Sequence, residues 1–338
     1  MQFNKIAMNL QARIDLMYRL GTYLKNNDKE WQDVKELASQ KNGWFVPEFI
    51  DLACEKIATN FLDKTLLEQW AAHYHLDDNI LAKNVGIVMA GNIPLVGFHD
   101  FLAVFISGHR QTIKLSTKDD VLLKHLVKKL YEWDILIQNH ISFSEILKGC
   151  DAYIATGSNN SARYFEQYFS KYPNIIRRNR TSAAILTGEE TAEQLDKLSD
   201  DIHQYFGLGC RNVSKLFVPR TYNFVPLIRS FDKYGYFGDH HKYKNNFDYQ
   251  LSLILLNNIY YMTNSATLLT ENEALFSPIS HLYYEYYDDV EKIRDRLSGN
   301  NDLQCIVDGD STAFGEAQNP GLFSYADGVD TMQFLLTF

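Results

Sequence analysis

Short apolar runs typical of strands alternate with helical segments between residues 84 and 186, and this alternation constrains the fold more than any other feature. The strand-like runs occupy residues 85–90, 112–115, 151–156 and 182–186, and helical patterns separate them. Strands that are joined through helices pair in parallel, because the chain returns to the same end of the sheet before each new strand. We therefore predict an α/β fold with a parallel sheet of Rossmann type over residues 84–186.

The chain before this segment has a helical pattern. Four apolar residues recur at spacings of four and three, namely Ile6, Leu10, Ile14 and Met17. They predict a helix that ends near Asn26, and two further helices are predicted over residues 50–58 and 66–73. Residues 1–83 should thus form a helical N-terminal layer that packs on the parallel sheet.

Beyond residue 186 helices and strands again follow one another. Helices are predicted over residues 191–206, 223–231, 247–262 and 289–297, and strands over residues 214–218, 267–270, 281–287 and 303–307. This order predicts a second α/β domain over residues 187–338, in which the segment 308–338 bridges back to the earlier part of the chain. No Gly-, Ser- or Pro-rich linker separates the two domains, so we expect a hinge within one compact body.

Composition excludes several classes of protein. With 46% hydrophobic and 22% charged residues the chain is globular, and a net charge of −9 disfavours binding to nucleic acid or to an anionic membrane. The longest apolar stretch, residues 93–106, contains His99 and Asp100 and is too short to span a bilayer. Four cysteines without a C-x-x-C pair suit a reducing compartment. We expect a cytoplasmic protein without stable membrane insertion.

One cysteine is a candidate nucleophile. Cys210 follows Gly207-Leu-Gly209 at the end of a predicted helix and directly before a predicted strand, where a turn can present its side chain. Neighbouring backbone N–H groups or Arg211 would stabilise its thiolate, which is the reactive form. The alternative is a buried, inert thiol. No His or Asn pattern of a cysteine protease surrounds it, and no third ligand accompanies His240-His241 at metal-binding spacing, so we expect no metal.

Three turns at strand ends offer polar groups to a ligand. Gly157 and Ser158 lie between a strand and a helix, where a phosphate can bind the helix N-terminus, although Ser158 could equally act as a simple helix cap. Lys114 ends the second strand and could meet a ribose hydroxyl or a phosphate, or be a solvated charge. Asn92 follows the first strand, and its amide could donate to a developing oxyanion or serve only the turn.

Taken in order, these segments resemble the aldehyde dehydrogenase superfamily, and within it the bioluminescence-type (LuxC-like) long-chain fatty acyl-CoA reductases. The resemblance covers roughly residues 80–338 and rests on six short motifs in the same order. The matching segments are Ala90-Gly-Asn92-Ile-Pro94, Thr112-Ile-Lys114-Leu-Ser116, Ala155-Thr-Gly157-Ser158, Gly207-Leu-Gly-Cys210, Glu273-Ala-Leu-Phe276-Ser-Pro278 and Phe314-Gly-Glu-Ala-Gln318.

The resemblance implies a role for each matching residue. Cys210 would be the nucleophile and Asn92 the oxyanion donor. The remaining matches would contact a nicotinamide cofactor, a set that comprises Lys114, Ser116, Thr117, Gly157, Ser158 and Phe276. The implied architecture is a cofactor domain over residues 84–186 and a catalytic domain that carries the cysteine over residues 187–338.

Departures from the superfamily's pattern refine the expected reaction. Hydrolytic members carry a Glu that activates water, and the corresponding position here is near Ile176, which cannot act as a general base. Thr117 replaces a Glu of NAD-specific relatives, and with Lys118 beside it this favours NADPH, with NADH possible. Ala274 stands where a Glu holds the nicotinamide ribose, unless Glu273 shifts into that place. The stretch before Val85 is short for the superfamily's oligomerisation hairpin, which puts the usual tetramer in doubt and leaves the oligomeric state open.

The sequence therefore predicts a fatty acyl-CoA reductase that converts an acyl thioester to an aldehyde through a thioester on Cys210, with CoA as the leaving group. The acyl donor is left open between acyl-CoA, an acyl carrier protein and the acyl group of a partner acyl-transferase or acyl-protein synthetase. One alternative is a CoA-independent NAD(P) aldehyde dehydrogenase. Another is a non-catalytic relative that acts as a binding subunit.

Overall fold

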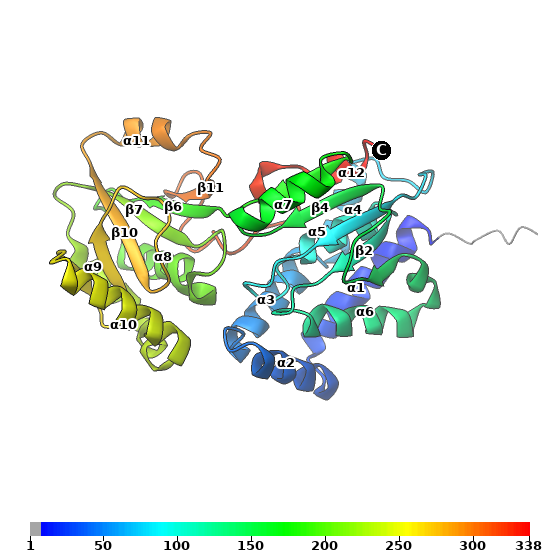
Figure 1. Cartoon of the computed structure of the whole chain (residues 1–338), viewed down its shortest axis with the longest axis horizontal. Helices are drawn as coiled ribbons and strands as arrows, with labels where there is room; N and C mark the ends of the chain where they lie inside the picture. Colours follow the sequence, from blue (N-terminus) through cyan, green and yellow to red (C-terminus); the bar gives the residue numbers. More distant parts are fainter. Residues whose placement is uncertain (1–7) are drawn as a thin grey trace, which may run out of the picture. The chain divides into compact units, whose positions relative to one another are not determined.

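The computed structural model describes residues 8–338, which form two compact units (Figure 1). The first unit contains the described residues up to Arg178 together with Gly321–Phe338, and the second contains Asn179–Pro320. Each unit has its own sheet. Ile6, the first residue of the predicted apolar stripe, lies outside the described residues.

The first unit holds a five-stranded parallel sheet with the order β3-β2-β1-β4-β5. Its strands are β1 (Asn84–Val88), β2 (Arg110–Lys114), β3 (Ile141–Phe143), β4 (Ala152–Thr156) and β5 (Asn174–Arg177). The predicted parallel α/β fold is thus confirmed, although β3 and β5 were not predicted. The order of the strands reverses at β1, whose two neighbours are β2 and β4, and such a reversal opens a crevice beyond the carboxyl ends of the strands.

Helices cover this sheet. They are α1 (Leu10–Asn26), α2 (Lys29–Lys41), α3 (Pro47–Asn60), α4 (Lys64–His73), α5 (Phe98–Ile106), α6 (Val121–Trp133), α7 (Asn159–Phe169) and α12 (Thr331–Leu335), with 3-10 turns η1 (Ile135–Asn139) and η4 (Ala326–Gly328). The predicted helical N-terminal layer is present, and α1 ends where expected because Asn27 adopts a left-handed conformation (φ +47°). Helix α2 was not predicted, because Trp31 and Ala38 are its only buried apolar residues and two residues give no helical pattern.

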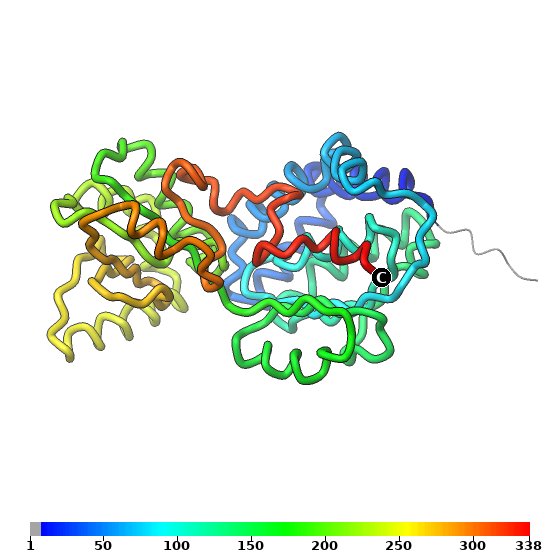
Figure 2. Tube along the Cα trace, turned by 90° about the horizontal axis from the view of Figure 1, so that it is seen from above, coloured from blue at the N-terminus to red at the C-terminus, as the bar shows by residue number. Residues whose placement is uncertain are grey.

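The C-terminal residues return to the first unit, and their red trace runs among its segments in Figure 2. The Trp70 indole N–H donates to the Tyr325 hydroxyl (2.9 Å), and the Tyr74 hydroxyl donates to Asp330 (2.6 Å). The return begins at Gly321, later than the predicted bridging segment 308–338. Within residues 8–338, no helix combines the length and the apolar character that crossing a membrane requires.

The second unit holds a six-stranded sheet with the order β11-β6-β7-β10-β9-β8, parallel except for the β8–β9 pair. The strands are β6 (Thr181–Ile185), β7 (Val213–Pro219), β8 (Met262–Thr263), β9 (Leu268–Glu271), β10 (His281–Tyr287) and β11 (Leu303–Val307). Strand β6 corrects the sequence analysis, which placed residues 182–186 in the first sheet. A fully buried apolar strand has the same pattern in either parallel sheet, so its sequence does not reveal which sheet it joins.

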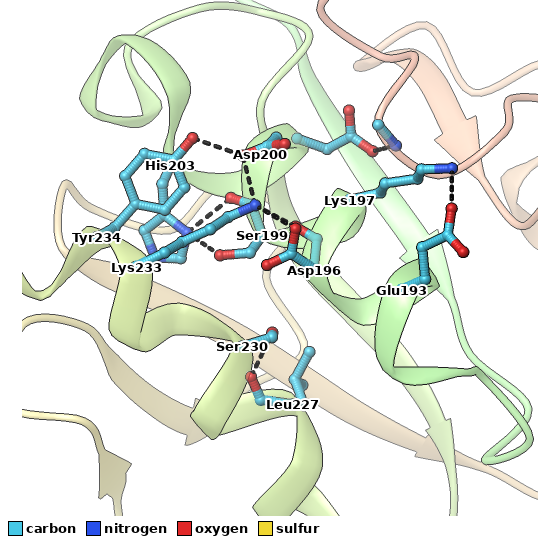
Figure 3. Close-up of polar contacts among 12 residues, drawn as sticks. Glu193, Asp196, Lys197, Ser199, Asp200, His203, Leu227, Ser230, Lys233 and Tyr234 are labelled. Carbon is cyan, nitrogen blue, oxygen red and sulfur yellow. Dashed lines mark hydrogen bonds and ion pairs between the residues drawn. The ribbon is translucent and has the colours of Figure 1, made fainter.

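The helices of the second unit are α8 (Ala192–His203), α9 (Phe224–Ser230), α10 (His241–Leu256) and α11 (Val290–Leu297), with 3-10 turns η2 (Gln204–Gly207) and η3 (Phe231–Asp239). Helix α10 begins and ends earlier than the predicted 247–262, because His240 accepts a hydrogen bond from the Tyr243 N–H at its start and Asn258 turns left-handed (φ +53°) after its end. Figure 3 shows how Lys233 of η3 pairs with Asp196 (3.0 Å) and Asp200 (2.8 Å) of α8.

Candidate active site

Cys210 lies on the turn between η2 and β7, as the sequence predicts, and its side chain is half-buried. Gly207 adopts a left-handed conformation (φ +73°), which glycine tolerates without a steric penalty. The two residues that precede Gly207, Tyr205 and Phe206, also have a left-handed backbone conformation (φ +57° and +58°), although both are aromatic and buried. Such conformations are costly and persist only where packing imposes them, and they concentrate at functional sites.

Asn212 organises this turn, a role that sequence reasoning missed. Its side chain accepts a hydrogen bond from the Gly209 N–H (2.8 Å). Its amide donates to the carbonyl oxygens of Asp201 (3.1 Å), Ile202 (3.2 Å) and Gln204 (2.9 Å) at the end of α8. The last carbonyls of a helix have no partner within the helix, so this buried amide fixes the turn that carries the cysteine to the helix before it.

Ser182 of β6 holds the same turn from the sheet. Its hydroxyl donates to the Cys210 carbonyl (3.1 Å) and contacts the Cys305 sulfur (3.0 Å). Asp201 of α8 accepts from the N–H groups of Gly315 (2.7 Å) and Ala317 (3.0 Å), which holds the predicted motif at residues 314–318 against the end of this helix. The turn that carries Cys210 is therefore anchored to α8 and β6 by buried polar groups.

The other three cysteines are poorly suited to nucleophilic chemistry. Burial raises the pKa of Cys54 to about 12 and raises the pKa values of Cys150 and Cys305 above their ordinary range. A raised pKa lowers the fraction of thiolate at neutral pH.

A partly enclosed hollow in the second unit adjoins Gly207. Its walls combine apolar and polar side chains, among them Phe206 and Tyr243, and two histidines line it. Burial lowers the pKa of both His203 and His281 to about 4, so these imidazoles are neutral at physiological pH. Neither histidine can serve as a cation that stabilises a thiolate.

At the carboxyl edge of the first sheet, the loops after β1 and β2 touch. A Cβ added at Gly91 would lie 2.7 Å from the Ser116 side chain, and the Leu95 N–H donates to the buried Asp119 carboxylate (2.7 Å). Asn92 is exposed on the first of these loops. The structure therefore brings the Asn92 loop and the Ser116 loop together.

The predicted cofactor residues at and just after the end of β2 are partly or fully exposed. Lys114 and Thr117 are exposed, and Thr117 lines a shallow hollow with Lys124 and Glu145. Ser116 accepts a hydrogen bond from the Lys118 N–H (3.2 Å). This edge offers hydroxyls and cations, together with the carboxylates of Asp120 and Glu145.

Gly157 and Ser158 connect β4 to α7. The Ser158 hydroxyl accepts from the Ser161 N–H (3.2 Å) and so caps α7, which confirms the simpler of its two predicted roles. A Cβ added at Gly157 would meet Ser161 and Phe165 at 2.9 Å, so glycine permits the close approach of the helix to the strand. An exposed helix N-terminus of this kind can also bind a phosphate.

Phe276 lies in the second unit, on the loop between β9 and β10, with 42% of its surface exposed. Glu273 and Ala274 of the same loop are exposed. Ile176, where hydrolytic relatives carry a Glu, lies within β5 of the first unit. In the part of the chain that the structure describes, no three His, Cys, Asp or Glu side chains form a metal-binding group.

Comparison with solved structures decides the architecture. Similar structures include aldehyde dehydrogenase 21 from Physcomitrella patens in complex with succinate (TM-score 0.63, 12% identity, 87% of this chain and 72% of that chain). They also include an aldehyde dehydrogenase from Bacillus cereus in complex with NAD⁺ (TM-score 0.61, 13% identity, 87% and 70%) and an indole-3-acetaldehyde dehydrogenase in complex with NAD⁺ (TM-score 0.62, 13% identity, 88% and 72%). The chain has the aldehyde dehydrogenase fold. The predicted fold class is confirmed.

At this level of identity the likeness concerns the fold alone. No family model and no curated protein matches the sequence. In the aldehyde dehydrogenase fold of this chain, Asn92, Lys114, Ser116, Thr117, Gly157 and Ser158 belong to the first unit, whereas Cys210 and Phe276 belong to the second.

Proposed function

We propose that the protein is an NADPH-dependent acyl-thioester reductase that forms aldehydes from fatty acyl-CoA. The observation that carries the proposal is the turn of Cys210, which the buried side chains of Asn212 and Ser182 fix to α8 and β6. Positioning a nucleophile in advance lowers the barrier to its attack, because the orientation is fixed before the substrate binds.

In the proposed reaction the Cys210 thiolate attacks the acyl carbonyl of acyl-CoA. A C–S bond to the enzyme forms, the bond to CoA breaks, and CoA leaves as a thiolate that takes up a proton. Asn92 and the Cys210 backbone N–H would donate to the oxyanion of this step. Hydride addition to the enzyme thioester would then give a thiohemiacetal anion, whose C–S bond breaks to release the aldehyde and to regenerate the Cys210 thiolate.

The absence of a carboxylate at Ile176 supports reduction over hydrolysis. The neighbouring Arg177 is buried, pairs with Asp100 and donates to the Thr331 hydroxyl (2.8 Å), so this strand end is occupied by a structural ion pair. Without a general base at this position, water attacks a thioester slowly. The thioester on Cys210 would persist until CoA or hydride resolves it.

The residues at the carboxyl edge of the first sheet fit a dinucleotide. The strand order reverses there, Gly157 leaves room beside α7, and the N-terminus of α7 suits a phosphate. Lys114 and Ser116 would bind the adenosine ribose, and Thr117 and Lys118 would bind a 2′-phosphate. Phe276 would contact the nicotinamide end. When bound, NADPH would supply the hydride.

The test is to follow NADPH absorbance with a series of acyl-CoA substrates. We expect turnover that falls by at least about 1,000-fold in Cys210→Ala. Acid formation from an aldehyde and NAD(P)⁺ without CoA would favour the CoA-independent dehydrogenase instead. Failure of calorimetry to detect cofactor binding would favour a non-catalytic binding subunit.

A further inference from the structure

The loop between β1 and α5, which carries Asn92, contains a strained residue. Leu95 has a left-handed backbone conformation (φ +56°), although its side chain is large and buried. Such a conformation is costly for a residue with a bulky side chain, and it persists only where the surrounding structure imposes it. Asn92 lies three residues earlier and is exposed. The backbone of Leu95 therefore helps to set the direction in which this loop presents Asn92.

Hydrogen bonds hold both backbone groups of Leu95. Its carbonyl oxygen accepts from the Phe98 N–H (2.9 Å) at the start of α5. Its N–H donates to the Oδ2 atom of Asp119 (2.7 Å), a residue of the loop that follows β2. The Asp119 N–H in turn donates to the Ser116 carbonyl (3.0 Å). Asp119 thus ties the Asn92 loop to the loop of the neighbouring strand.

These two loops pack without space between them. A Cβ added at Gly91 would lie 2.7 Å from the Ser116 side chain and 3.2 Å from the Cβ of Asp119, so glycine permits this close approach. Because Gly91 directly precedes Asn92, a shift of the Asp119 loop would also shift Asn92.

The carboxyl group of Asp119 is poorly satisfied for a buried polar group. The residue is 7% exposed, and among residues 8–338 its second oxygen, Oδ1, has no hydrogen-bond partner. A buried carboxyl group with a single hydrogen bond lowers the stability of a fold, whereas an amide would accept the same bond without a buried charge. Stability therefore does not account for Asp119, and departures of this kind are expected where function needs a fixed geometry.

We propose that Asp119 is a positioning residue, which fixes the Asn92 loop through the Leu95 N–H so that the Asn92 amide is oriented before the oxyanion forms. The inference rests on the proposed function, in which Asn92 donates to that oxyanion. A donor that is fixed in advance stabilises the transition state without reorganisation. Loss of Asp119 should therefore lower kcat, while the KM for acyl-CoA changes little.

The experiment is steady-state kinetics with acyl-CoA and NADPH. Leu has the branched shape of Asp but accepts no hydrogen bond, and we expect kcat to fall at least about 10-fold in Asp119→Leu. Asp119→Asn keeps an acceptor for Leu95 and should stay within about 3-fold of the wild type. The matched control is Asp134→Leu, which removes the acceptor of another backbone N–H in the first unit, that of Leu136 (2.8 Å), and should leave kcat unchanged.

Thermal unfolding checks that each variant is folded, and Asp119→Ala replaces Asp119→Leu if the larger side chain prevents folding. Wild-type kcat in the folded Leu or Ala variant would overturn the inference. An equal loss in Asp119→Asn would overturn it as well, because the acceptor would then not matter. An equal loss in Asp134→Leu would do the same, since the effect would then be a general one.

A double-mutant cycle tests whether Asp119 acts through Asn92. We expect Asn92→Ala to lower kcat, and the double variant Asn92→Ala/Asp119→Leu to stay within about 2-fold of Asn92→Ala alone. Losses that multiply would overturn the positioning role and leave the proposed reaction intact. A wild type that does not reduce acyl-CoA, or one whose kcat Asn92→Ala leaves unchanged, would instead refute the proposed function or its oxyanion donor, and this inference with it.

Discussion

The four thiols of the chain differ in their surroundings, and this difference should govern their reactivity. Burial raises the pKa of Cys54 to about 12 and also raises the pKa values of Cys150 and Cys305, whereas Cys210 is half-buried on a turn. We expect iodoacetamide at pH 7.5 to modify Cys210 at least about 10-fold faster than any other cysteine, since only thiolate reacts. Peptide mass spectrometry over time measures this. Equal rates for Cys210 and Cys305 would contradict it.

Asn212 should contribute more to stability than an ordinary buried side chain. Asn212→Ala leaves the Gly209 N–H and three helix-end carbonyls without their partner, and we expect the free energy of unfolding to fall by about 2–4 kcal/mol. Urea denaturation measures this. Asn257→Ala is the control, because Asn257 makes one exposed bond to the Leu253 carbonyl and should cost about 0.5 kcal/mol or less. Equal losses in both variants would refute the role of Asn212.

The buried Asp119 carboxyl predicts a pH-dependent stability. Burial raises its pKa from 3.8 to about 7, against the opposing effect of the Leu95 N–H. The folded state therefore binds more protons than the unfolded state between these values. The stabilisation is complete below pH 3.8 and is lost as pH rises through 7, with a total on the order of 4 kcal/mol.

Asp119→Asn removes this dependence, since an amide keeps an acceptor for Leu95 without a charge. We expect urea denaturation to show that the variant gains stability relative to the wild type by about 2–4 kcal/mol between pH 5 and pH 8. Asp120→Asn is the control. Although burial opposes it, hydrogen bonds from Lys41 and Lys124 hold the pKa of Asp120 below its usual value, so that residue stays ionised throughout this range. A wild-type pH profile that Asp119→Asn leaves unchanged would show that Asp119 is already ionised at low pH.

Among the elements, the N-terminus of α7 carries the most direct test of cofactor binding. Aspartate caps a helix as well as serine does, so Ser158→Asp should keep the stability of α7 while its charge repels a bound phosphate. We expect calorimetry to show NADPH affinity at least about 10-fold weaker in Ser158→Asp and little changed in Ser158→Asn. Equal NADPH affinities of the wild type and Ser158→Asp, with an unchanged melting temperature, would mean that Ser158 only caps the helix.

The sequence predicted elements wherever a local pattern specifies them. The turn of Cys210 was predictable because Gly207 and Gly209 lie between a helix and a strand. Asn212 was not, since its importance depends on where α8 ends in space. The role of Ser182 was not predicted for a related reason. Strand β6 was assigned to the wrong sheet, and the hydrogen bond from Ser182 to Cys210 joins residues that lie 28 positions apart in the sequence.

For the whole molecule, the alternation of strands and helices predicted two α/β bodies, and the resemblance of six short motifs implied the aldehyde dehydrogenase fold. The boundary between the two bodies was harder to predict from the sequence. The chain passes from β5 to β6 with only three residues, Arg178, Asn179 and Arg180, between the strands, so no change in composition marks the passage from one sheet to the next.

The central claim is that the acyl group is carried by Cys210, and intact-protein mass spectrometry after mixing with an acyl-CoA series tests it most directly. In the absence of NADPH we expect one adduct with the mass of the acyl chain, located at Cys210 by peptide mapping, absent in Cys210→Ala and released when NADPH is added. No adduct with any acyl-CoA, or an adduct that persists in Cys210→Ala, would contradict the proposed chemistry.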